Sequence, residues 1–194
     1  MDANAILQTT LVILILLGVI FNNSYSRHKT PATPYEDLRT QALGTDALSI
    51  STDPTDPATP FGAIMEIGFP GTVVTLVTFN SGKAALHFSN GENVTADQPP
   101  TALREAALAF VQKANVYVAM LQRVDTFPLP RKGSVRFYVL TQGGIYSAEL
   151  PEKYLQESAS TLTELYEYGH NVIYQLGKLK HSRINPSGNS PESY

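Results

Sequence analysis

The sequence predicts an α/β two-layer sandwich: an antiparallel sheet in the order β-β-β-α-β-β-α with its helices on one face, preceded by a single N-terminal transmembrane helix. Three observations lead to this prediction. Short runs rich in β-branched and aromatic residues alternate with Gly, Asn and Pro, as antiparallel strands alternate with turns. Two longer segments, 101–123 and 160–179, repeat apolar residues at spacings of three and four, the period of a helix buried on one side. Near the start, a long apolar run carries no charge.

The apolar run Ala5 to Phe21 predicts a membrane anchor over residues 1–23. At about 1.5 Å per residue, a helix over residues 3–23 spans roughly 30 Å, the thickness of the hydrocarbon core. A helix buried in a protein core is one alternative, but it needs apolar partners around its whole circumference. A cleaved signal peptide is the other, but the start is not basic and the small-residue cleavage site is poor. We therefore expect an uncleaved signal-anchor, with the lipid bilayer as its partner.

The flanks of the anchor predict its orientation. Arg27 and Lys29 follow the apolar run, and no basic side chain precedes it. The positive-inside rule then places the domain in the cytoplasm. An extracytoplasmic domain is the alternative, since only two basic residues decide between them.

Residues 24–60 read as a linker rich in Pro, Thr and Asp, interrupted by one short helix over 34–43. Pro at the start of that helix, acidic residues in its first turn and Gly just past its end are the expected helix signals. Tyr35, Leu38 and Ala42 give it one apolar edge, which is suited to docking on the domain that follows.

Residues 61–180 form the predicted globular α/β domain. The expected strands cover residues 61–67, 73–79, 83–89, 134–141 and 145–150. In the third strand, Ala84, Leu86 and Phe88 alternate with more polar residues, which is typical of an antiparallel sheet covered on one face. Gly169 lies on the apolar stripe of the last helix, where it costs about 1 kcal/mol relative to Ala, so we expect a close approach there. The polar residues 181–194 are expected to be a disordered tail.

The helix expected over 101–123 has more apolar residues than one buried face requires. Beyond the main stripe it carries Leu108, Val111, Val116 and Met120. We interpret these four residues as an oligomer or partner face. In outline, the whole domain is similar to the profilin, roadblock and longin group of small scaffold domains, although its element order is not that of roadblock domains. This likeness concerns the fold alone.

Composition and motifs exclude several classes of function. The formal net charge of −3 argues against a nucleic-acid partner, and the absence of cysteine excludes disulfides, thiol nucleophiles and cysteine metal sites. The four histidines show no ligand spacing, so no metal is expected. No phosphate-binding loop or nucleophile elbow is present either. We therefore name no catalytic residue and no cofactor, and an enzyme is the least favoured of the function classes.

Two polar groups remain as candidate sites. Alternation places Thr75, His87, Arg136 and Tyr138 on the outer face of the sheet, with Glu149 as a fifth member. These residues form either an ordinary solvated sheet face or a site for a ligand or partner. The last helix carries a polar side with Glu167, His170, Asn171 and Tyr174, in which we interpret the histidine as a surface residue.

The sequence thus favours a membrane-anchored, non-enzymatic interaction or scaffold domain that binds a protein partner or itself. The alternative is a small-ligand-binding or sensor domain that uses the outer sheet face.

Overall fold

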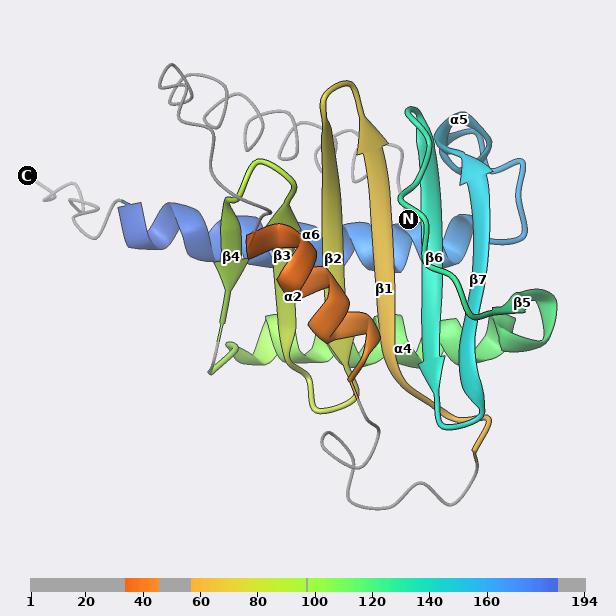
Figure 1. Cartoon of the computed structure of the whole chain (residues 1–194). Helices are drawn as coiled ribbons and strands as arrows, with labels where there is room; N and C mark the ends of the chain where they lie inside the picture. Colours follow the sequence, from red (N-terminus) through yellow and green to blue (C-terminus); the bar gives the residue numbers. More distant parts are fainter. Residues whose placement is uncertain (1–33, 46–56, 97, 185–194) are drawn as a thin grey trace, which may run out of the picture.

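The computed structural model describes residues 34–45, 57–96 and 98–184. The predicted anchor and most of the linker and tail lie outside these ranges. Within them, no helix is both long enough and apolar enough to cross a bilayer. The chain has an α+β fold, with a seven-stranded antiparallel sheet and, in the described ranges, four α-helices (Figure 1).

The strands follow one another in the sheet as β4-β3-β2-β1-β6-β7-β5. Their bounds are β1 Pro60–Phe69, β2 Thr72–Phe79, β3 Ala84–Phe88, β4 Asn93–Thr95, β5 Gln122–Val124, β6 Ser134–Thr141 and β7 Gly144–Pro151. The five strands expected from the sequence are confirmed to within a few residues at each end. The two edge strands, β4 and β5, were missed because three residues are too few to show alternation.

Two long helices cover one face of the sheet, α4 (Thr101–Tyr117) and α6 (Thr163–Ile184) (Figure 1). The main core lies between them and the sheet, and includes Met65, Leu76, Phe110 and Phe137. Gly169 of α6 is confirmed as a point of close approach, because a Cβ atom there would lie 2.7 Å from the sulfur of Met65.

Both helices differ from their expected ranges. α4 ends at Tyr117 instead of residue 123, and a short 3₁₀ helix, η1 (Val118–Met120), follows it. The chain then extends at Leu121, which is buried, and joins the sheet edge as β5. A short helix, α5 (Glu152–Gln156), separates β7 from α6. The last helix continues to Ile184, so the first four residues of the expected disordered tail are helical.

The helix expected over residues 34–43 is confirmed as α2 (Pro34–Leu43), and it docks on the domain as its apolar edge suggested. It crosses β3, β2 and β1 on the face opposite α4 and α6 (Figure 1). Ala42 and Leu43 pack there against Ile64, Val77 and Tyr138. The two long helices of the predicted sandwich do lie on one face, and α2, from the predicted linker, adds a partial third layer over the other face.

Candidate functional site

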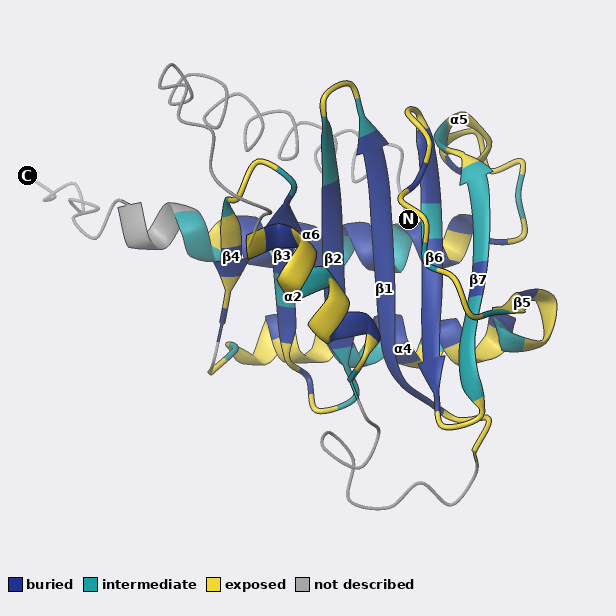
Figure 2. Ribbon diagram, in the orientation of Figure 1, coloured by how far each residue is buried: buried dark blue, intermediate teal, exposed yellow. Residues whose placement is uncertain are grey.

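A row of polar side chains crosses the outer face of the sheet, and we call it the polar row. Its members are direct neighbours on adjacent strands, in the order Asn93, His87, Thr75, Glu66, Arg136 and Glu149. Directly opposed residues of antiparallel strands share one face and contact each other. The register of the sheet therefore places six polar side chains from six strands in one line. α2 lies across the central strands on this face (Figure 2), and its Tyr35 and Arg39 contact Thr75 and Glu66 in the middle of the row.

Glu66 is the central acid of the polar row, and its side chain is fully buried. Arg39 of α2 donates to both of its carboxylate oxygens, from Nε at 2.6 Å and from Nη2 at 3.0 Å. A buried carboxylate needs both a counter-charge and hydrogen bonds, and a forked guanidinium supplies both. The Glu66–Arg39 pair therefore ties α2 to the middle of the sheet.

Tyr35, one turn before Arg39, makes the second polar contact of α2. Its hydroxyl lies 2.8 Å from Oγ1 of Thr75, and Thr75 in turn donates to Glu66 at 3.2 Å. A threonine hydroxyl has one proton, so Tyr35 must be the donor to Thr75. Burial, with a further contribution from the charge of Glu66, raises the pKa of Tyr35 to about 12, although the hydrogen bond to Thr75 opposes the shift. The phenol thus stays protonated and continues to donate.

The other half of the polar row is covered by the segment between β5 and β6. The Tyr138 hydroxyl donates to the carbonyl of Pro128 at 2.8 Å, and Arg39 donates to the same carbonyl at 3.3 Å. Arg136 donates to Glu149, which also accepts from the backbone and side chain of Arg131 at 3.0 and 3.1 Å. Burial alone would raise the pKa of Glu149, but these hydrogen bonds and the charges of Arg136 and Arg131 outweigh it, so the pKa is lowered.

Not every polar atom of the outer face has a partner. In the described part of the chain, five buried side-chain polar atoms lack a hydrogen bond, and three of them belong to this face: His87 Nδ1, Arg136 Nε and Ser147 Oγ. His87 is 6% exposed, and burial lowers its pKa, so the imidazole is neutral at pH 7. The face therefore retains hydrogen-bonding capacity that the described residues do not use.

The four site residues predicted on the outer face, Thr75, His87, Arg136 and Tyr138, do lie together there. The interpretation as a solvated face is wrong, however, since Thr75 and Tyr138 are fully buried beneath α2 and its neighbours. Sequence analysis missed Glu66 and Arg39. Glu66 is the one charged residue of β1, which was the available signal.

The expected partner face of α4 is only partly exposed. Val111 belongs to the main core and is 3% exposed, so its assignment to a partner face is wrong. Leu108 is half-buried. Val116 and Met120 remain largely exposed, at 65% and 63%.

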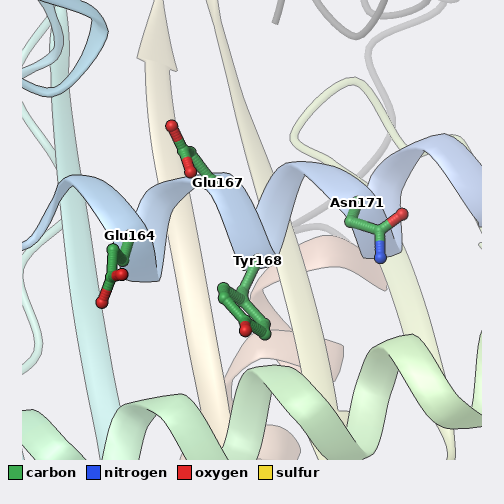
Figure 3. Close-up of a pocket in the computed structure, with 4 residues that line it drawn as sticks. All are labelled: Glu164, Glu167, Tyr168 and Asn171. Atoms are coloured by element: carbon green, nitrogen blue, oxygen red, sulfur yellow. The ribbon is translucent and has the colours of Figure 1, made fainter. Parts of the chain in front are cut away.

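The polar side of α6 also needs a correction. His170, interpreted as a surface residue, is buried against the ring of Tyr166, with 4.1 Å between ring centroids. The outer side of the same helix borders a hollow of about 390 Å³, which Glu164, Glu167, Tyr168 and Asn171 line (Figure 3). Glu164 accepts there from Lys113 and Tyr117 of α4, each at 3.1 Å, so its charge is already engaged.

Comparison of the chain with protein-family models, with curated proteins and with solved structures gives no match.

Proposed function

We propose that this chain is a membrane-tethered, non-enzymatic interaction domain that binds a protein partner or a second copy of itself. The observation that carries the proposal is the exposure of two large apolar side chains, Val116 at the end of α4 and Met120 in η1, which follows it. Val116 lies in the last turn of α4 and Met120 at the end of η1, so both exposed side chains lie within one five-residue stretch of the chain. Large apolar side chains exposed together are typical of a contact surface.

The surroundings of this pair fit the same function. Lys113, three positions before Val116 on α4, forms an ion pair with Glu164 at 3.1 Å. Its Nζ atom also lies 5.0 Å from the centroid of the Tyr168 ring. An apolar centre with a polar rim is the usual composition of a protein interface. Methionine adapts its shape to a partner because its side chain is unbranched and flexible.

The membrane part of the proposal rests on the sequence. The apolar run Ala5 to Phe21 and the basic residues that follow it favour a single-pass anchor with a cytoplasmic domain. Protease treatment of intact cells tests the orientation: a cytoplasmic domain is protected until the membrane is permeabilised. Cleavage of the domain in intact cells would instead support the extracytoplasmic alternative.

Site-specific photo-crosslinking of the full chain in its membrane tests the contact surface. A photoreactive residue at Val116 or Met120 should give a discrete crosslinked band, to a second copy or to another protein. The same group at Asn93, exposed on β4, serves as the matched control and should give none. Val116→Glu should abolish the band obtained from position 120 without lowering the Tm. Equal crosslinking from positions 93, 116 and 120, or none from any, would contradict the proposal.

A small-ligand sensor is the second candidate, because His87 Nδ1 and Arg136 Nε are buried without a partner among the described residues. Thermal-shift screening of the full chain should then reveal a stabilising metabolite. His87→Ala or Arg136→Ala should abolish the shift, and a response that survives both substitutions would exclude this face as the ligand site.

A further inference from the structure

α2 is attached to the rest of the fold in a separable way. Its contacts with the sheet come from the side chains of Tyr35, Arg39, Ala42 and Leu43. Among the backbone hydrogen bonds between described residues, none joins α2 to a strand; at its end, Gly44 donates back to Thr40 within the helix. An isolated helix of this length is barely stable in water, so α2 needs the outer face to stay helical.

The domain does not need α2 in the same way. The main core lies on the other face of the sheet and contains no α2 residue. Only the smaller outer cluster includes the helix, through Ala42 and Leu43 beside Phe61, Ile64 and Val77. Departure of α2 would therefore leave the main core intact and uncover an apolar face with an unpaired carboxylate, Glu66, at its centre.

Any segment that replaces α2 on this face has to meet strict requirements. It must bring a guanidinium to Glu66, because an unpaired buried charge is costly. One turn earlier it must donate a hydrogen bond to Thr75, and one turn later it must present small and branched apolar side chains to Ile64 and Val77. A second copy of the same helix meets all of these requirements, because its sequence is the same.

We propose that two copies of this chain exchange α2, so that Arg39 of each copy pairs with Glu66 of the other. This inference rests on the part of the proposed function in which the chain binds a second copy of itself. Sixteen residues separate Leu43 from Pro60. A segment of this length can span at most roughly 50 Å at about 3.3 Å per residue, which is enough to reach a neighbouring domain. The exchanged pair keeps every α2 contact and has two-fold symmetry. Attachment of both copies to one membrane raises their effective concentration.

A charge-reversal pair of full-length variants tests the exchange. Arg39→Glu places two acids together in one chain, and Glu66→Arg places two bases together in the other. When the two variants are co-expressed with different tags, exchange restores an opposite-charge pair at both sites. Purification in mild detergent should then recover the mixed pair at least tenfold above either variant paired with itself. A chain that carries both substitutions, R39E/E66R, is the control, because it tests whether α2 still docks when the charges of the pair are reversed.

Introduced cysteines provide a second measurement that leaves the Glu66–Arg39 pair intact, since the chain has no cysteine of its own. Tyr35→Cys on one tagged copy and Thr75→Cys on the other should give a covalent heterodimer with a short bismaleimide. Both substitutions on one chain provide the control for reagent reach. Intrachain crosslinking of this control without any heterodimer would overturn the exchange.

The outcomes separate the exchange from the proposed function. Equal recovery of mixed and like pairs in the charge-reversal experiment would mean that copies associate through another surface. It would overturn the exchange while the crosslinks from Val116 and Met120 still support the interaction domain. Loss of those crosslinks alone would instead overturn the α4 contact surface and leave the exchange standing.

Discussion

Replacement of Glu66 by Gln should release α2 from the outer face without unfolding the domain. Glu66 is fully buried and accepts two hydrogen bonds from Arg39 and one from Thr75. Glutamine supplies one acceptor oxygen and turns an NH₂ group toward the guanidinium, so Arg39 loses its counter-ion. Removal of one partner from a buried ion pair costs about 3–5 kcal/mol. Arg39 is 13% exposed and also donates to Pro128, so we expect about 3 kcal/mol, the lower end of this range.

This cost falls on the docking of α2, because the main core contains no residue of that helix. A loss of about 3 kcal/mol increases the undocked population roughly 100-fold. Trypsin cleavage after Arg39 measures this undocked population directly. Arg39 lies within α2, so trypsin cuts there only after the helix leaves the sheet. When opening is fast relative to cleavage, the cleavage rate follows the open fraction. Mass spectrometry of the full chain should show cleavage after Arg39 accelerated by up to that factor, while the Tm of the domain falls only slightly.

Glu92→Gln is the matched control for this experiment. Glu92 pairs with Lys180 at 3.1 Å, but the glutamate side chain is 36% exposed. An exposed pair contributes about 0–1 kcal/mol, so cleavage after Arg39 should change less than about fivefold. Equal cleavage in the wild type and in Glu66→Gln would refute the role of the Glu66–Arg39 pair. A large loss of Tm with no local cleavage would refute the separability of α2.

Two further predictions concern stability. Gly68→Ala should cost about 2–4 kcal/mol in thermal unfolding, because the added Cβ would lie 2.3 Å from the carbonyl oxygen of Arg131, part of the backbone. Gly71→Ala, at φ +81° with open space around it, should cost only about 1 kcal/mol; similar losses would contradict the steric explanation. Burial lowers the pKa of His170 from 6.5 to about 3. Between pH 6.5 and pH 3 the histidine is therefore protonated in the unfolded chain but not in the folded one, so the free energy of unfolding decreases as the pH falls. The loss at pH 5 should be about 2 kcal/mol in chemical unfolding. His170→Leu should remove most of this loss of stability at low pH and leave a smaller loss caused by His87, whose pKa is also lowered. If the stability of the variant depended on pH as steeply as that of the wild type, His170 would not be the cause of the loss.

The sequence predicted the strands well because alternation and turn residues are local signals. In β3, the apolar residues at 84, 86 and 88 were enough to identify the buried face, and the register confirms it. Likewise, the expected end of β6 at Thr141 is correct, since the turn sequence Gln142-Gly-Gly144 follows it. Where such signals lasted for only three residues, as in β4 and β5, no local pattern could identify the strand.

The outer face could not be predicted to the same depth, because its burial depends on a contact distant in sequence. Alternation placed His87 and Arg136 on the correct face, yet nothing near them in the chain indicates a cover. The cover comes from Arg39, which is 27 residues before Glu66. The signals were a single acid within an apolar strand and an arginine within a short helix. Each is ordinary alone, and only the fold brings them together.

The contact that holds α2 on the sheet is centred on a buried ion pair, and this choice of contact favours selectivity for one helix. Apolar side chains of similar size would often hold a helix as firmly as a buried ion pair does, since desolvation offsets much of the electrostatic attraction. Glu66 of the outer face nevertheless lies at the centre of the α2 contact, where it forms an ion pair with Arg39. A helix without a basic residue at that position would leave the acid unpaired, so the pair excludes most other helices more effectively than it strengthens the docking of α2. Such selectivity matters little for a helix that never leaves its site. It matters for a site that opens and must receive the same helix again, from its own chain or from a second copy.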